Sequence, residues 1–175
     1  MSAHPKPKAP KPKYPKPKYP KLRAALLRDP IHFLALGFGA GLAPKAPGTA
    51  GTIVAIPLIM FIGSYGWSAL AMASLVLCVS GVYICHMSAK KLGVHDHPGI
   101  VFDEIAGFAI TMLGAPITWV SLTVGFALFR FFDIVKPWPI READHSLKGG
   151  LGIMLDDVIA GIFAGTILYA LQTVL

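Results

Sequence analysis

Five acidic residues lie within or beside long apolar segments of this 175-residue sequence: Asp103, Glu104, Asp133, Asp156 and Asp157. A charged side chain at membrane depth costs at least about 2.5 to 3.5 kcal/mol, so it normally faces the protein interior and has a partner. An acid at a helix start can instead interact with the helix dipole, which accounts for one of the five but not for all. Oxygen ligands without cysteine clusters suit a hard ion, and the pattern therefore favours Mg²⁺.

The adjacent pair Asp156 and Asp157 stands in the apolar stretch "GIMLDDVIAG". Neighbours on a helix point about 100° apart, so the two carboxylates can reach two different ligands or two sides of one ion. The flanking sequence offers no cation nearer than Lys148. We expect both acids to touch the ion, with Asp157 the less dispensable of the two.

Cations for binding a phosphate group occur in two places. Arg130 and Lys136 flank Asp133 at three-residue spacing and share its helical face, although two local ion pairs at a helix end would give the same pattern. Arginine binds phosphate as a fork and lysine as a point charge. In "APKAPGTAGT", Lys45 precedes an expected helix start with Thr49, where free N–H groups attract anions.

The apolar runs predict helices. No Lys, Arg, Asp or Glu occurs between residues 46 and 89, and Pro57 with the "GSYGW" turn divides this run into helices near 49–63 and 67–88. A run over 105–129 is broken by "GAP", and the last run covers 158–175. The expected fold is all-α: a polytopic membrane bundle of about five helices.

The charges predict an orientation. Lys45, Lys90 and Lys91 flank the first two helices, which favours a hairpin with both ends in the cytoplasm. Residues 105–129 either cross the membrane once or form a re-entrant or short hairpin. We favour the hairpin because it places the polar loops, and with them the acids, together on the cytoplasmic side.

The composition separates a tail from a membrane domain. The chain is 54% hydrophobic and only 14% charged, against about 25% charged in soluble domains, so residues 29–175 are interpreted as one membrane domain. Nine of the 16 Lys and Arg residues lie in residues 1–28, a disordered Pro-rich tail with three "KPKYP"-like repeats. The net charge of +7 thus belongs to the tail, and it predicts contact with anionic lipids and no nucleic-acid partner. A solubilising extension is the alternative.

Four motifs resemble one known family, the bacterial phosphatidylglycerophosphatase A proteins, over residues 30–171. They are "GFGAGLAPKAPGTAGT", "GVHDHPGIVFDEIAG", "FRFFDIVKPWPIREAD" and "KGGLGIMLDDVIAG". The resemblance implies Mg²⁺-dependent removal of the terminal phosphate from phosphatidylglycerophosphate, giving phosphatidylglycerol in the bacterial inner membrane. The Pro-rich tail is not part of the family pattern.

The residues suggest how such a reaction proceeds. No Asp-x-Asp-x-Thr or Cys-x5-Arg nucleophile motif occurs, so our hypothesis is attack by a metal-activated water. The expected Mg²⁺ ligands are Asp103, Asp133, Asp156 and Asp157. Glu104 is a further ligand or a base, and His95 or His97 could carry a proton. The expected phosphate-binding residues are Lys45, Thr49, Arg130 and Lys136. The remaining polar residues of the last loop are assigned no role: Arg141, Glu142, Asp144, His145 and Lys148.

Alternatives remain at this point. The most serious is a phosphatase acting on another lipid phosphate, because the motifs specify the headgroup chemistry better than the lipid. Acids within a membrane also mark ion-coupled transporters, but the internal repeats typical of transporters are not found outside the tail. A non-catalytic scaffold whose Pro-rich tail binds SH3-like domains would leave the five acids unexplained.

Overall fold

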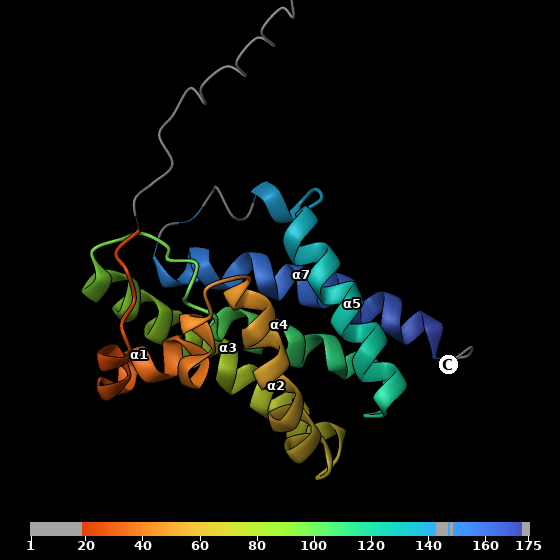
Figure 1. The fold of residues 1–175 in the computed structure, drawn as a ribbon. Helices are drawn as coiled ribbons and strands as arrows, with labels where there is room; N and C mark the ends of the chain where they lie inside the picture. Colours follow the sequence, from red (N-terminus) through yellow and green to blue (C-terminus); the bar gives the residue numbers. More distant parts are fainter. Residues whose placement is uncertain (1–18, 143–146, 148, 173–175) are drawn as a thin grey trace, which may run out of the picture.

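The computed structural model describes residues 19–142, 147 and 149–172, which fold entirely into helices and turns with no strand (Figure 1). In chain order the elements are η1 (Ala24–Arg28), α1 (Pro30–Ala35), η2 (Gly37–Leu42), α2 (Pro47–Gly63), α3 (Trp67–Leu92), α4 (Phe102–Thr111), η3 (Met112–Gly114), α5 (Trp119–Val135) and α7 (Gly150–Leu171). The predicted all-α class is confirmed. The short helices around α1 raise the number of elements above the five expected.

Two of the described helices, α3 and α7, are long and apolar enough to cross a membrane. The helix α2 is apolar but shorter. Both α2 and α3 lie where the sequence predicted helices near 49–63 and 67–88. Pro57 is accommodated within α2 without ending it.

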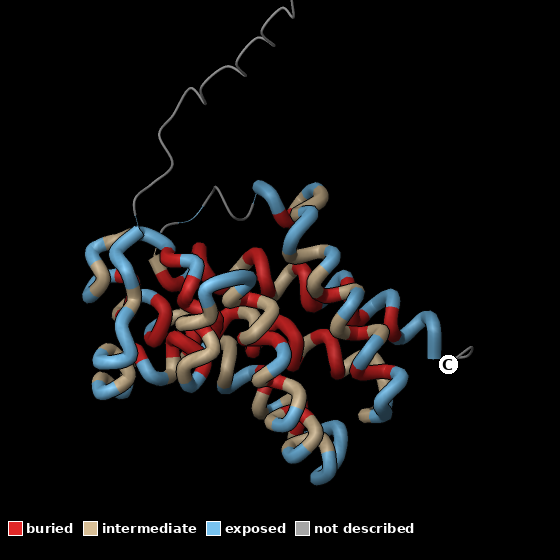
Figure 2. Tube along the Cα trace, viewed as in Figure 1, coloured by how far each residue is buried: buried red, intermediate tan, exposed pale blue. Residues whose placement is uncertain are grey.

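The helix α7 occupies the middle of the bundle and contacts α3, α4 and α5. Figure 2 shows buried residues gathered along α4 and α7. The two helices approach closely because glycines face backbone: a Cβ at Gly107 would lie 2.6 Å from the Asp157 carbonyl oxygen, and Gly161 packs on the Gly107 carbonyl. Small residues at such crossings let helix backbones touch. This contact sets the position of Asp157 relative to α4.

The segment 105–129 turns back on itself. It leaves α4 and η3 through the extended residue Ala115, and α5 begins after Thr118, whose hydroxyl accepts the Ser121 N–H at 3.1 Å. At the far end of α5, Arg130 Nη1 lies 4.0 Å from Glu104 Oε1 at the start of α4. The two ends of this segment therefore meet at one place.

The helix α7 begins at Gly150, ahead of the apolar run 158–175 that the sequence marked. Asp156 and Asp157 consequently lie inside the helix and are 7% and 3% exposed. Residues such as Leu151 and Met154 are good helix formers, so two adjacent acids do not prevent the helix from starting earlier.

Part of the predicted tail and loop lies outside the described residues. This holds for residues 1–18, which carry most of the tail repeats, and for Asp144, His145 and Lys148. Residues 19–28 are described and end in η1. The division of the chain at residue 28 stays a prediction.

We expect Gly161→Ala to destabilise the protein because the added methyl would press on the Gly107 carbonyl. Overpacking of this kind costs about 1 to 3 kcal/mol, so the midpoint of thermal unfolding in detergent should fall. The matched control is Gly125→Ala in α5, where the nearest atom is the flexible Met112 sulfur at 2.9 Å. Equal midpoints for the two variants would contradict the close contact of α4 and α7.

Candidate functional site

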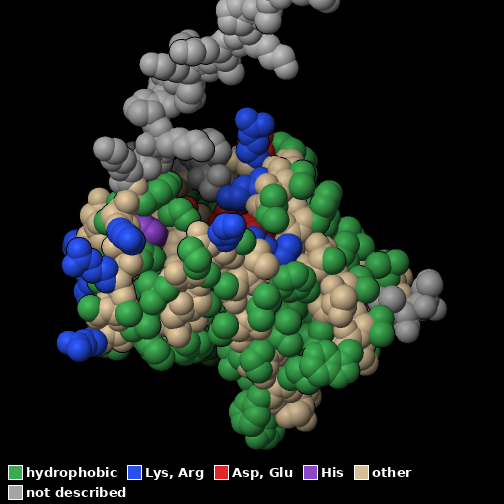
Figure 3. Space-filling model, viewed as in Figure 1, with side chains coloured by type: hydrophobic (Ala, Val, Ile, Leu, Met, Phe, Trp, Pro, Cys, Tyr) green, Lys and Arg blue, Asp and Glu red, His purple; other side chains and the backbone are tan. Residues whose placement is uncertain are grey.

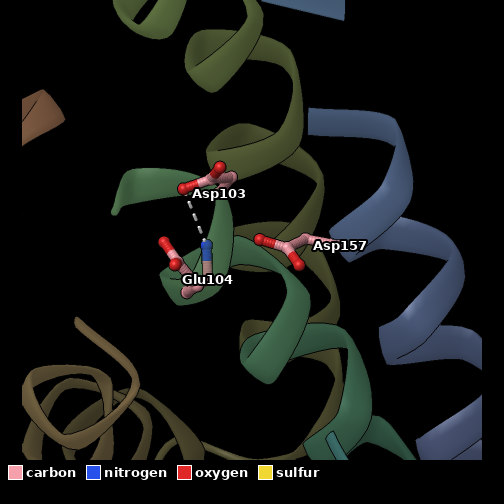
Figure 4. Close-up of side chains that lie close together, drawn as sticks. All are labelled: Asp103, Glu104 and Asp157. Atoms are coloured by element: carbon pink, nitrogen blue, oxygen red, sulfur yellow. Dashed lines mark hydrogen bonds between the residues drawn. The ribbon is translucent and has the colours of Figure 1, made fainter. Parts of the chain in front are cut away.

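Three carboxyl groups meet where α4 crosses α7: Asp103 and Asp157 are buried, and the Glu104 side chain is 12% exposed. Asp103, Glu104 and Asp157 each offer one oxygen, and these oxygens lie within 4.8 Å of one another. Figure 4 shows Asp157 pointing from α7 toward the two acids at the start of α4. Asp103 Oδ1 accepts the Glu104 N–H at 3.1 Å. We call these three residues the acid cluster.

The acid cluster contains oxygens without a hydrogen-bond partner. Among the described residues, none donates to Glu104 Oε2 or to Asp157 Oδ1, although both atoms are buried. Asp103 and Glu104 lie in the first turn of α4, which has ten residues. Ionised carboxylates in such a place need a cation.

The acid cluster fits a divalent cation on chemical grounds. Its donors are carboxylate oxygens from two helices, with no sulfur or imidazole among them. Such a donor set suits a hard ion, which takes carboxylate oxygens together with water. Two buried oxygens without partners are available for coordination.

Arg130 lies at the edge of the acid cluster, as the sequence led us to expect. Its Nη1 is 2.6 Å from Asp133 Oδ2, one helical turn away in α5, and 4.0 Å from Glu104 Oε1. The side chain is 14% exposed, and its Nε has no hydrogen-bond partner among the described residues. An arginine with a donor to spare beside buried carboxylates can bind an anion that enters the site.

The adjacent acids of α7 do face different partners. Asp157 joins the acid cluster, whereas Asp156 Oδ2 lies 2.6 Å from Lys136 Nζ. Lys136 ends α5 with φ of 44°, a left-handed conformation that is strained for a residue with a side chain. Asp133 and Asp156, two of the four expected metal ligands, are thus paired with cations here, and their role as ligands stays a prediction.

The start of α2 also reaches the acid cluster. Gly48 is buried, and a Cβ there would lie 3.1 Å from Arg130 Nη1 and would overlap Glu104 Oε1. A larger residue at this position would displace the Glu104 carboxylate from where it lies. Lys45 is exposed in the loop before α2 and Thr49 is half-buried in its first turn, so the predicted phosphate loop lies beside the acids. The sequence analysis identified the loop as a candidate phosphate site but did not single out Gly48. Its position within the glycine-containing motif "APGTAGT" is the sequence feature that could have identified it.

The two histidines have other contacts. His95 is exposed, and its Nε2 accepts the Gly149 N–H at 3.3 Å. His97 is buried, its Nδ1 accepts the Gly99 N–H at 3.0 Å, and its Nε2 lies 2.9 Å from the Pro20 carbonyl oxygen. This network places the proton of His97 on Nε2. Proton transfer by either residue stays a prediction.

A cavity of about 590 Å³ lies at the other end of the bundle, between the α2–α3 turn, η3 and the end of α7. Trp67, Leu70, Met112 and Tyr169 are among its walls, and no Lys, Arg, Asp or Glu of the described part of the chain lines it. A cavity without charged groups cannot neutralise the charge of a phosphate. It therefore differs from the acid cluster both in position and in the ligands that it could bind.

The profile of the phosphatidylglycerophosphatase A family matches residues 33–172. The chain belongs to the phosphatidylglycerophosphatase A family. It is 44% identical over 144 residues to phosphatidylglycerophosphatase A of Escherichia coli, covering 82% of this chain and 84% of the relative. It is 43% identical over 157 residues to the Haemophilus influenzae phosphatidylglycerophosphatase A, covering 86% and 94%.

A third relative carries a different name. A Bacteroides thetaiotaomicron protein, provisionally named a phosphatidylinositol-3-phosphatase, is 38% identical over 140 residues, which cover 75% of this chain and 86% of the relative. No solved structure matches the chain.

Membership of the phosphatidylglycerophosphatase A family confirms the predicted reaction. The enzyme is a phosphoric monoester hydrolase of phospholipid biosynthesis that dephosphorylates phosphatidylglycerophosphate to phosphatidylglycerol. Its matched region contains every residue of the acid cluster together with Arg130, Lys136 and Gly48.

We expect Asp157→Asn to lower phosphate release from phosphatidylglycerophosphate at least 100-fold, because the amide keeps the shape of the side chain but removes its negative charge. The control is Asp29→Asn, which removes a carboxylate from the partly exposed pair with Lys91 and should leave turnover within about 2-fold. Thermal unfolding in detergent should show both variants folded. Turnover of Asp157→Asn near that of the unmodified enzyme would exclude Asp157 from the site.

Proposed function

We propose that the acid cluster is the centre of the phosphatase site and that it holds Mg²⁺ through Asp103, Glu104 and Asp157. The supporting observation is a set of three neighbouring carboxylates beside Arg130. Among the described residues, Glu104 Oε2, Asp157 Oδ1 and Arg130 Nε have no hydrogen-bond partner although they are buried atoms. When bound, the cation would neutralise phosphate charge and activate a water molecule. Asp133 and Asp156 are either further ligands or the groups that hold the nearby cations.

The residues around the acid cluster would bind and orient the phosphate. Asp133 and Asp156 hold Arg130 and Lys136 by contacts of 2.6 Å, which keeps both cations near the place where a phosphate meets the acids. The first turn of α2, with Thr49, would add backbone N–H donors. Lys45, which is exposed, would attract the anionic headgroup from solution.

The reaction would cleave the bond between phosphorus and the glycerol oxygen. A water oxygen attacks phosphorus, the water loses a proton, and the departing glycerol oxygen gains one. Glu104 is either a ligand of the cation or the base that accepts the proton of the water. His95 is exposed in the loop between α3 and α4, contacts Gly149 just before α7, and would be the residue that carries a proton between the site and solvent.

We also propose that the enzyme spans the bacterial inner membrane several times with the acid cluster on the cytoplasmic side. The helix α3 presents an apolar outer surface, with Met72, Leu75, Val76 and Val79 each more than half exposed. Such a continuous surface favours contact with lipid over water. The turn at residues 115–118 would make α4 and α5 a hairpin within the membrane.

The two ends of the bundle differ in a way that supports this orientation. Lysines and arginines lie around the acids and at the left of the view, whereas the lower part of this face shows hydrophobic and other uncharged side chains (Figure 3). Exposed aromatic side chains mark the opposite helix ends: Tyr65, Trp67, Trp119 and Tyr169. Cations favour the cytoplasmic face, and aromatic residues favour the membrane interface. The basic tail would then contact anionic lipids of the inner leaflet.

Another lipid phosphate is the second candidate substrate, because one relative is provisionally named a phosphatidylinositol-3-phosphatase. The acid cluster and Arg130 would recognise any phosphate monoester on a lipid headgroup. The lipid is therefore distinguished by contacts beyond the phosphate.

Phosphate release should be measured with phosphatidylglycerophosphate, phosphatidic acid and phosphatidylinositol-3-phosphate in mixed micelles. We expect the first substrate to give kcat/KM at least 10-fold above the others, since only it offers the phosphoglycerol headgroup. EDTA should abolish the activity, and added Mg²⁺ should restore it. Full activity in EDTA would contradict the proposed cation.

Cysteine labelling tests the orientation. Single cysteines at Pro98 and Arg141, in a background without Cys78 and Cys85, should react with an impermeant maleimide only from the cytoplasmic side. A cysteine at Ser64, in the turn after α2, should react only from the opposite side. Labelling of positions 98 and 141 from opposite sides would contradict a shared cytoplasmic site.

A further inference from the structure

The root of the basic tail, residues 19–22, is bound to the loop that leads into the acid cluster. Pro20 offers its carbonyl oxygen to His97 Nε2 at 2.9 Å. The Tyr19 ring stands edge-on to the His97 ring, with centroids 5.3 Å apart. Leu22 reaches Gly99 so closely that a Cβ on Gly99 would overlap its Cδ1. These contacts hold the His97 side chain and the loop backbone at Gly99 in place. We call residues 19–22 the arm root.

The loop that receives the arm root is held on its other side by the rest of the fold. Gly99 and Gly41 pack backbone against backbone, and neither has room for a side chain. The Val101 N–H donates to the Ala35 carbonyl at 2.8 Å, and the Ile100 N–H donates to the His97 carbonyl at 2.8 Å. The loop is therefore clamped between the arm root and the α1–η2 region.

This clamped loop continues directly into α4. Val101 is the residue that caps α4, it provides no side-chain cap, and Asp103 and Glu104 lie in the first turn. The position of these two carboxylates therefore depends on the backbone of residues 97–101. Mg²⁺ requires near-ideal octahedral geometry with ligand distances of about 2.0 to 2.1 Å, so small displacements of its ligands weaken binding.

We propose that the arm root is a positioning element of the metal site, acting through His97. His97 is a positioning residue in this account: its Nδ1 shapes the loop through Gly99, and its Nε2 holds the arm root. The inference rests on the proposed function, because it assumes that the acid cluster binds a divalent cation. It assigns a role to residues 19–22 that the repeats before them do not share.

Two truncations of the full-length enzyme separate the arm root from the repeats. Removal of residues 2–22 deletes both, whereas removal of residues 2–18 deletes the repeats except for Tyr19 and Pro20, which belong to the arm root. Binding of Mn²⁺ to the purified metal-free protein, in detergent without anionic lipid, is measured by titration calorimetry. We expect the shorter chain to bind Mn²⁺ roughly 3- to 10-fold more weakly, a loss equivalent to one hydrogen bond. The chain that begins at the arm root should bind like the full-length protein.

Two substitutions distinguish the hydrogen bond of His97 to Gly99 from its hydrogen bond to Pro20. In His97→Asn the amide oxygen can still accept the Gly99 N–H, as asparagine does in turns, but the side chain is too short to reach Pro20. In His97→Gln the longer amide can still donate to the Pro20 carbonyl. We expect His97→Asn to reproduce the loss caused by removing residues 2–22, and His97→Gln to retain most of the affinity. Combining His97→Asn with that truncation should add nothing, because both remove the same interaction.

The outcomes separate the possible readings. Equal Mn²⁺ affinity with and without residues 19–22, or losses that multiply in the combined variant, would overturn the inference. A lower unfolding temperature with unchanged Mn²⁺ affinity would also overturn it, since the arm root would then serve stability alone.

If the chain that lacks residues 2–22 fails to fold, Leu22→Ala in the full-length chain is measured in its place, and this variant should also bind Mn²⁺ more weakly. Absence of Mn²⁺ binding by the full-length enzyme would instead refute the proposed metal site itself.

Discussion

The structure depends on one electrostatic constraint: three carboxyl groups are buried together where two helices cross. One oxygen each of Asp103, Glu104 and Asp157 lies within 4.8 Å of the others, and Arg130 Nη1 is 4.0 Å from Glu104 Oε1. Burying like charges without compensation costs several kcal/mol per group. Arg130 alone cannot compensate all three acids, and it is also held by Asp133 at 2.6 Å. The divalent cation proposed for this site would supply the missing charge, and a bound phosphate would then lie between that cation and Arg130.

The rest of the fold can be understood as the means of bringing these acids together. Glycine contacts between α4 and α7 place Asp157 beside the first turn of α4. The turn after η3 returns the chain so that Arg130 reaches the same place. Gly48 lets the start of α2 approach the arginine and Glu104. Each of these contacts requires a small residue or a chain reversal at a defined position, which explains the many glycines around the site.

The helices, and the closeness of Asp103, Glu104 and Asp157, were predictable from the sequence because they depend on local signals, whereas the roles of these residues stay predictions. Apolar runs without charges specified α2 and α3, and the "GAP" break specified the turn between α4 and α5. The acids Asp103, Glu104 and Asp157 stood out because charge is rare in such segments. The pairing within the site was not predictable. That Asp156 meets Lys136 while Asp157 meets α4 follows from the rotation of α7, which glycine packing decides. The bond from His97 to Pro20 joins residues 77 positions apart, and no local pattern indicates it.

The location of the cation is the most direct test of this account. Crystals of the enzyme grown with Mn²⁺ in place of Mg²⁺ would reveal the ion by its anomalous scattering. The account predicts a peak between the carboxylates of Asp103, Glu104 and Asp157, about 2 Å from at least two of their oxygens. A protein that binds Mn²⁺ only elsewhere, with the three carboxyl groups in contact and no peak among them, would contradict it.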